Sequence, residues 1–398
     1  MNRKDFSRVK CAMNVVISSA LVLFMSACGS GMSNTDNTAL IPKEDKKSGK
    51  WGYVNEKGEE ILSFKYDNAD NFSEGFAKVT LNGSEIFINK EEQEFEFIST
   101  LSDGLRSVRS NRKFGFADTT GNVVIPVQYD AAGKFSEGLA PVLMTVVNPP
   151  LVAPITSYGY IDKTGKEVIP FQYDAATDFS EGLASVAKKG KGYGFIDKTG
   201  KEIIPLKYEA AFPFSDGLSK VWLKSKWGYI DKQENVIVPI KYDAIRDFSE
   251  GLAMVFLNKK CGYVDKAGKE VIPIKYGGAR DFSEGLAMVT FNGMKGDFSQ
   301  QYSYMISMGV VLPGIQGFGY IDKTGKEIIP MKYEEGKDFS EGLAAVKING
   351  KWGFVDVTGK EVIRFEYEDA ESFSEGKAIV KLKQKEFFID RTGKEVQD

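Results

Sequence analysis

The sequence predicts an all-β protein made of tandem antiparallel β-meander repeats of about 34 residues, arranged as a curved, open superhelix or solenoid. Three observations support this fold class. A long pattern recurs in register down most of the 398-residue chain. Turn signals separate short runs rich in aromatic and β-branched residues. Beyond the N-terminal segment, no window shows the 3.6-residue apolar period of a long amphipathic helix.

The repeated unit begins at an aromatic-Gly pair and continues through an Asp-Lys-Thr-Gly string to a Phe-Ser-Glu-Gly string. Its spacing divides residues 50–398 into nine units and a truncated tenth, with insertions near residues 143–157 and 292–316. The aligned unit starts, most of them 34 residues apart, are Trp51, Glu85, Phe114, Tyr158, Tyr193, Trp227, Cys261, Phe318, Trp352 and Glu386.

Within the unit that begins at Tyr158, the sequence predicts three short strands. The first two, residues 158–161 and 166–169, are joined by a tight turn in which Gly165 adopts a left-handed backbone at little cost. We expect Pro170 to end the second strand, because proline has no N–H to continue a ladder. A linking segment with a second turn follows, and residues 183–186 form the third strand.

Apolar side chains occur on both faces of these strands, with bulky rings on one face and small residues on the other. A flat ribbon would leave both faces in water, so the sheet must coil or close on itself. A β-propeller is the alternative arrangement. Nine or ten units exceed the usual number of propeller blades, however, and three strands are fewer than the usual four. An open superhelix is therefore favoured.

The N-terminus has the order of an export signal: basic residues, then an apolar stretch, then small residues. The segment Met25-Ser26-Ala27-Cys28-Gly29 resembles the lipobox of bacterial lipoproteins, although a methionine stands at the usual leucine position. This resemblance implies that residues 1–27 are a lipoprotein signal peptide and that Cys28 carries lipid. A plain secretory signal and a short transmembrane helix are the alternatives. Residues 28–49, which are polar and have little to bury, are expected to form a flexible stalk.

The repeats carry Trp-Gly dipeptides at Trp51-Gly52, Trp227-Gly228 and Trp352-Gly353, inside a pattern that covers about 350 residues. In this respect the chain resembles the bacterial WG-repeat family, and with its N-terminus it resembles a WG-repeat lipoprotein. The resemblance implies an all-β repeat protein. It supplies no catalytic residue that can be assigned to a position of this sequence.

The composition argues against most catalytic and nucleic-acid functions. The chain has no histidine, which removes the usual general base and the commonest metal ligand. A formal net charge of −3 leaves no basic excess for a phosphate backbone, so no nucleic acid is expected as a partner. Repeated acids such as Asp162 and Glu181 are better explained as turn residues than as calcium ligands or a catalytic pair. Cys261 replaces an aromatic ring and is expected to be a buried small side chain. No catalytic residue, metal or cofactor is predicted.

The insertions are the exceptions to the repeat. Residues 292–316 include Phe298, Tyr302 and Tyr304 and are more apolar than a solvated loop, and Trp222 places an indole ring where other units have none. These four residues are the candidate partner-binding residues, because insertions in solenoids often cluster on the binding face. The alternative is that the insertion side chains cap a neighbouring unit.

The predicted function is therefore that of a non-catalytic, lipid-anchored binding or scaffold protein of the cell envelope. Its folded part lies outside the cytoplasm, lipid on Cys28 attaches it to a membrane, and its repeat surface faces an unidentified envelope protein or glycan. Two other functions remain open: a carboxylate-based envelope hydrolase, and a structural spacer without a specific ligand.

Overall fold

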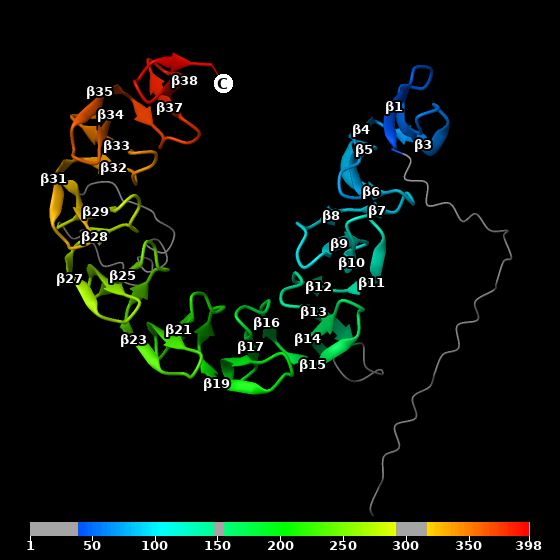
Figure 1. The fold of residues 1–398 in the computed structure, drawn as a ribbon, viewed down its shortest axis with the longest axis horizontal. Helices are drawn as coiled ribbons and strands as arrows, with labels where there is room; N and C mark the ends of the chain where they lie inside the picture. The colour runs from blue at the N-terminus through cyan, green and yellow to red at the C-terminus, as the bar shows by residue number, and fades with distance from the viewer. Residues whose placement is uncertain (1–38, 147–154, 292–316, 398) are drawn as a thin grey trace, which may run out of the picture.

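The computed structural model describes residues 39–146, 155–291 and 317–397. In these ranges the chain forms ten antiparallel sheets and no helix, so no helix there is long and apolar enough to cross a membrane. The sheets follow one another around an arc whose first and last members do not meet (Figure 1). The predicted all-β, open, curved repeat architecture is confirmed. Each sheet is oriented radially, as a propeller blade would be, but the ring is not closed.

Nine of these sheets contain four strands, which we call the inner, second, third and fourth strands in chain order. The first sheet of the chain has no inner strand and contains only a second, a third and a fourth strand. The inner strands lie toward the concave side of the arc and the fourth strands toward its outside (Figure 1). The inner strands have two residues each: β4 (Asn68–Ala69), β8 (Phe97–Ile98), β12 (Ala131–Ala132), β16 (Ala175–Ala176), β20 (Ala210–Ala211), β24 (Ala244–Ile245), β28 (Gly278–Ala279), β32 (Glu335–Gly336) and β36 (Asp369–Ala370).

The second and third strands form the long hairpin of each sheet. The second strands are β1 (Ile41–Asp45), β5 (Phe76–Leu81), β9 (Arg106–Ser110), β13 (Leu139–Val146), β17 (Ala184–Lys188), β21 (Leu218–Leu223), β25 (Leu252–Leu257), β29 (Leu286–Thr290), β33 (Leu343–Ile348) and β37 (Lys377–Leu382). The third strands are β2 (Lys50–Val54), β6 (Ser84–Asn89), β10 (Lys113–Ala117), β14 (Ile155–Asp162), β18 (Gly192–Ile196), β22 (Lys226–Asp231), β26 (Lys260–Asp265), β30 (Phe318–Asp322), β34 (Lys351–Asp356) and β38 (Lys385–Asp390).

The fourth strands form the outer edge of the sheets. They are β3 (Glu60–Tyr66), β7 (Glu94–Phe95), β11 (Val123–Tyr129), β15 (Glu167–Tyr173), β19 (Glu202–Tyr208), β23 (Val236–Tyr242), β27 (Glu270–Tyr276), β31 (Glu327–Tyr333), β35 (Glu361–Tyr367) and β39 (Glu395–Val396).

Each four-stranded sheet combines parts of two successive sequence units. In the sheet β16–β19, for example, β16 and β17 come from the unit that begins at Tyr158, and β19 comes from the unit that begins at Tyr193. A single sequence unit therefore cannot complete a sheet without its neighbour. This explains why residues 39–49, expected to belong to the stalk, are instead folded: β1 pairs with β2, with Ile41 opposite Val54, and supplies the second strand that the first aromatic-Gly strand needs.

The prediction of three strands per unit was wrong in two details. The segment after each fourth strand, expected to be a linker, adds the two-residue inner strand. The second predicted strand also does not end at Pro170, because β15 continues to Tyr173. Tyr158 pairs with Tyr173 and Tyr160 with Ile169, so β15 bulges at the proline. An outer edge strand tolerates proline at a bulge because no ladder hydrogen bond is required there.

The bulge also explains the glycine of the aromatic-Gly pair. A Cβ placed on Gly159 would lie 2.8 Å from the carbonyl oxygen of Ile169, closer than real Cβ contacts allow. The equivalent glycines meet the same backbone carbonyl at 2.4–2.8 Å: Gly52, Gly115, Gly194, Gly228, Gly262, Gly319 and Gly353. Close approach of the fourth strand, and not a special backbone angle, therefore requires glycine here.

The core lies between neighbouring sheets. Tyr160 of β14 packs on Phe179, which precedes the second strand of the next sheet, with ring centroids 5.0 Å apart, and its hydroxyl donates to the Thr177 carbonyl at 2.8 Å. Both rings are buried. The same pair of rings recurs along the arc: Tyr53–Phe72, Phe116–Phe135, Phe195–Phe214, Tyr229–Phe248, Tyr263–Phe282, Tyr320–Phe339 and Phe354–Phe373.

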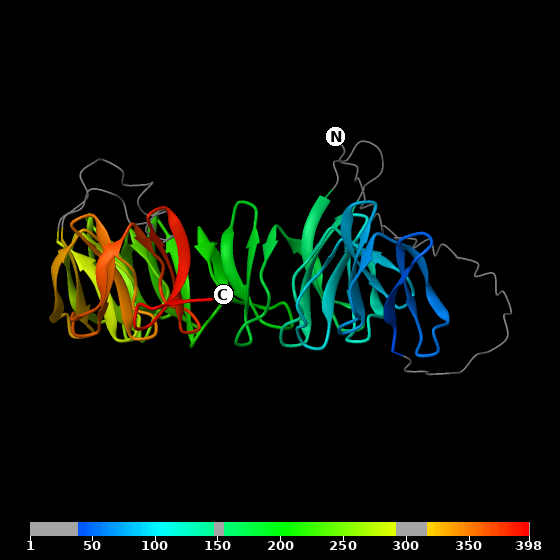
Figure 2. The same cartoon turned by 90° about the horizontal axis from the view of Figure 1, so that it is seen from above.

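The strands run between two rims of the curved band (Figure 2). The loops between second and third strands form one rim, which we call the hairpin rim. The turns between third and fourth strands and the Phe-Ser-Glu-Gly turns form the other, which we call the turn rim.

We predict that Phe179→Ala lowers the free energy of unfolding by about 3 to 5 kcal/mol, because it removes a buried ring from the contact between two sheets. Urea unfolding followed by circular dichroism measures this change. The matched control is Phe97→Ala, since the Phe97 side chain is 45% exposed and its loss should cost far less. Equal effects of the two substitutions would contradict the assigned role of the ring pair.

Candidate binding surface

The Asp-Lys-Thr-Gly turns use their aspartates to fold the turn. Asp162 Oδ1 accepts hydrogen bonds from the Thr164 hydroxyl at 2.6 Å, the Thr164 N–H at 2.9 Å and the Lys166 N–H at 3.1 Å. The hydrogen bond from the Thr164 side chain contributes most to lowering the pKa of Asp162. Asp197, Asp322, Asp356 and Asp390 repeat this arrangement. Across the described ranges, no three Asp, Glu or Cys side chains gather as a metal site would require.

The Phe-Ser-Glu-Gly turns connect one sheet to the next. Glu137 has a left-handed backbone, with φ of +55°, and its carboxylate accepts the Gly182 N–H of the next sheet at 3.0 Å. Lys198, also of the next sheet, pairs with the same carboxylate at 2.9 Å. Burial alone would raise the pKa of Glu137, but the lysine and the amide outweigh it and the pKa is lowered. The equivalent carboxylate–amide contacts are Glu181–Gly217, Glu250–Gly285, Glu284–Gly342 and Glu341–Gly376.

The serine of each turn adds a second bond in the same direction. Ser180 Oγ donates to the carbonyl oxygen of Phe214, in the turn of the next sheet, at 2.7 Å. Ser102, Ser136, Ser249, Ser283 and Ser340 make the same bond to the next turn. The sequence indicated only solvated turns at these acids, whereas the structure uses serine and glutamate together to join the sheets. The sequence signal for this joining role was the fixed spacing of the Ser-Glu-Gly string, because a contact between neighbouring units requires that spacing.

Cys261 lies where other units have a ring, and it is buried as expected, with no exposed surface. Burial raises the pKa of its thiol to about 12. The side chain is therefore a neutral thiol inside the core between β26 and β28.

The hairpin rim carries both insertions at equivalent positions. One interrupts the hairpin β13–β14 and the other the hairpin β29–β30. Phe298, Tyr302 and Tyr304 lie outside the described residues. At the bases of the two loops, Ile155 is 57% exposed and Phe291 is 49% exposed.

Trp222 lies in an uninterrupted hairpin of the same rim, β21–β22. It is half-buried and stacks on Trp227, which is opposite it in the register, with ring centroids 5.5 Å apart and planes at 10°. Phe212, which is 43% exposed, packs against Trp227 at 5.9 Å. The structure therefore places Trp222 in a cluster of three rings, on the rim that carries the insertions.

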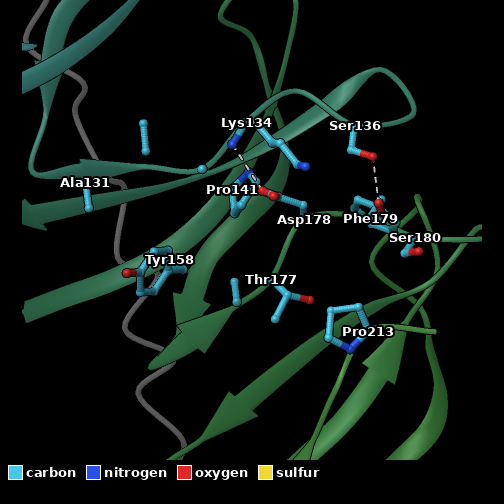
Figure 3. Close-up of a pocket in the computed structure, with 13 residues that line it drawn as sticks. Ala131, Lys134, Ser136, Pro141, Tyr158, Thr177, Asp178, Phe179, Ser180 and Pro213 are labelled. Carbon is cyan, nitrogen blue, oxygen red and sulfur yellow. Dashed lines mark hydrogen bonds between the residues drawn. The ribbon is translucent and has the colours of Figure 1, made fainter. Parts of the chain in front are cut away.

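A cavity of about 570 Å³ opens between the sheets β12–β15 and β16–β19. Figure 3 shows its lining, which includes Lys134, Pro141, Tyr158 and Asp178. Asp178 accepts the Lys134 N–H at 3.1 Å, and burial raises the pKa of its carboxyl. The sequence analysis did not identify this site, because its residues come from two sheets and none of them forms a motif. The only sequence signal is a glycine at position 133, where other units have a longer side chain.

The lowered pKa values of the turn-rim glutamates predict acid sensitivity of the fold. The Glu250 carboxylate pairs with Lys323 at 3.0 Å and has a lowered pKa despite its burial. Its contribution to stability is therefore present above the ordinary glutamate pKa of about 4.3 and is lost as the pH falls through the lower folded value.

We expect Glu250→Gln to melt below the parent at pH 7, and we expect the two melting curves to converge below about pH 4. Thermal unfolding by circular dichroism between pH 7 and pH 3 measures this difference. Glu60→Gln, at an exposed position, is the control and should follow the parent throughout. A difference in melting temperature between Glu250→Gln and the parent that stays constant with pH would contradict the stabilising role of the charged Glu250 carboxylate.

The model of the WG containing repeat family matches residues 51–84, 114–144, 158–191, 193–226, 227–261, 262–294, 318–352 and 352–385. No curated protein matches the sequence significantly.

Among solved structures, a eukaryotic initiation factor is 12% identical, with 79% of this chain and 92% of that chain covered and a TM-score of 0.41. BamB from Moraxella catarrhalis is 8% identical, with 73% and 95% covered and a TM-score of 0.32. Because its family model covers more than half of the sequence in eight matches, the chain belongs to the WG containing repeat family.

Proposed function

We propose that the protein is a non-catalytic binding scaffold of the cell envelope, attached to a membrane by lipid on Cys28. Its repeat domain presents the hairpin rim to an envelope protein or glycan. The observation that carries this proposal is the location of the irregular features. Both insertions and the Trp222–Trp227 stack occur in second-to-third-strand hairpins, so they share one rim. A shared rim with exposed apolar groups suits the recognition of a large partner.

The non-catalytic part of the proposal is supported by how the acidic side chains are used. The repeated aspartates fold their own turns, and the repeated glutamates bind the next sheet. A hydrolase with two carboxylates needs a pair that faces a shared substrate cleft. The turn-rim carboxylates are instead spread evenly along the arc, one set for each sheet.

The attachment part of the proposal rests on the sequence before β1. Residues 29–40 separate Cys28 from β1, and this length of chain spans at most about 40 Å when fully extended. A lipid on Cys28 would therefore hold the first sheet within about 40 Å of the membrane. The later sheets extend along the arc from that point.

We predict that Cys28→Ser releases the protein from the membrane, because serine has no thiol to carry the acyl chains. Several buried acyl chains hold a protein in a bilayer far more firmly than one. Fractionation of cells into soluble and membrane parts, with mass spectrometry of the N-terminus, measures the effect. Cys11→Ser is the matched control and should remain acylated at Cys28. Recovery of Cys28→Ser in the membrane fraction in acylated form would refute the anchor.

We also predict that the pair Tyr302→Ala and Tyr304→Ala weakens capture of a partner from envelope extract by at least tenfold relative to the parent, since large rings dominate interface energies. Quantitative mass spectrometry of the captured material and a sugar assay cover both partner classes. Trp222→Ala tests the same rim, and Phe97→Ala is the control for an exposed ring elsewhere. Equal capture by all four proteins would show that the partner binds elsewhere than on the hairpin rim. No capture by the parent would favour the alternative function of a structural spacer without a specific ligand.

A further inference from the structure

The faces between neighbouring sheets carry a row of equivalent positions on the concave side. The residue after each inner strand approaches the next sheet, and an acid often stands opposite it. Arg246 pairs with Asp281 at 2.8 Å, and Arg280 pairs with Asp338 at 3.5 Å. In another sheet the cation is supplied by a lysine of the second strand: Lys220 pairs with Asp247 at 2.6 Å. Each of these three aspartates therefore receives a cation from the preceding sheet.

Asp178 occupies the same position as those aspartates, but among the described residues no ion pair joins it to the preceding sheet; Lys134 favours its charged form through space only. The position of Arg246 is Gly133 in the preceding sheet, and the position of Lys220 is Pro141. Neither residue carries charge. Within the described ranges, the contact found for the Asp178 carboxylate is the backbone N–H of Lys134, and the exposed Lys134 side chain forms no ion pair with it.

A pocket opens beside this carboxylate, and it is not the space that a side chain at position 133 would fill. Gly133 lies directly against the Asp178 carboxylate, since a Cβ on Gly133 would lie 2.4 Å from Asp178 Oδ1 and 2.7 Å from the Pro141 ring. The cavity of about 570 Å³ lies at this place and is lined by Gly133, Lys134, Pro141, Tyr158 and Asp178 (Figure 3). Its volume lies in the range of ligand sites. This interface therefore has a pocket beside its aspartate where other interfaces have an arginine–aspartate or lysine–aspartate pair.

The ring of Tyr158 gives the pocket a second feature that suits a cation. Tyr158 is the aromatic start of its unit and corresponds to Trp352 in another sheet. There, Lys337, which is equivalent to Gly133, lies with its Nζ 5.8 Å from the Trp352 ring centroid and pairs with Glu371 of the next sheet. The fold therefore already uses this ring position to hold a cation between two sheets.

We propose that the pocket between β12–β15 and β16–β19 binds a guanidinium group, as carried by an arginine side chain of a peptide, which takes the place of the arginine that this interface lacks. Asp178 accepts its N–H groups and the Tyr158 ring lies along the slot. Guanidinium is favoured over ammonium because the two residues that pair with an equivalent aspartate from the position of Gly133, Arg246 and Arg280, are both arginines. The site is separate from the hairpin-rim surface and does not depend on it.

The test is calorimetric titration of the full chain, at low salt, with acetyl-Gly-Arg-Gly-amide. The neutral citrulline analogue has nearly the same shape and should bind at least about tenfold more weakly, as expected for the loss of a charge-assisted hydrogen bond. The lysine analogue should bind more weakly than the arginine peptide. Agmatine separates the two sources of the group: binding as tight as the peptide's indicates a small guanidine, and weaker binding indicates a peptide.

Two variants test the position of the site. Asp178→Asn should weaken binding of the arginine peptide at least about tenfold, and Pro141→Lys should block it by supplying the cation from within, as Lys220 does. Asp247→Asn is the matched control, since its position is already paired, and should leave binding unchanged. Tyr302→Ala with Tyr304→Ala should also leave it unchanged, which separates this site from the rim. Equal binding of the citrulline peptide, undiminished binding by Asp178→Asn or Pro141→Lys, or no binding of the arginine peptide at millimolar concentration would overturn the proposal.

Discussion

The structure depends on contacts between neighbouring sheets, because no sequence unit can bury its own apolar groups. A ring on the third strand of one sheet packs on a phenylalanine at the entry of the next, as Tyr160 does on Phe179. A serine hydroxyl and a glutamate carboxylate then bond to the backbone of the following turn. The same three contacts recur along the arc, so the curvature is set by one geometry applied many times. Because the contacts are repeated and local, the arc has no need to close.

The two rims of the band are subject to different constraints, and this separates structural from variable positions. The turn rim carries the bonds between sheets, so its Asp, Ser, Glu and Gly recur in nearly every unit. In the described residues the hairpin rim carries none of these serine and glutamate bonds, so it accepts insertions. The insertion in residues 292–316 leaves the contact between its neighbours intact, since Ser283 still donates to the Phe339 carbonyl at 2.8 Å across it. Variation therefore collects where it costs least stability.

Charge pairs on the concave side show how one position can serve stability at some interfaces and remain open at another. Arg246, Arg280 and Lys220 each supply a cation to an aspartate of the next sheet. Such exposed or half-exposed pairs are individually worth little, so losing one pair costs the fold little. At the interface of Gly133 and Asp178 the acid and the ring are present without such a pair, and a cavity lies beside them.

The sequence by itself determined the all-β repeat, its period, the turns at Asp162 and Gly165, and the burial of Cys261, because each of these follows from local pattern and side-chain type. It did not determine the fourth strand, the strand that continues through Pro170, or the folding of residues 39–49, because these depend on backbone pairing between segments that no local pattern links. The pocket at Asp178 was decided only by the tertiary structure. Its residues lie on two different sheets, and its one sequence signal, the glycine at position 133, indicates no pocket until the sheets are brought together.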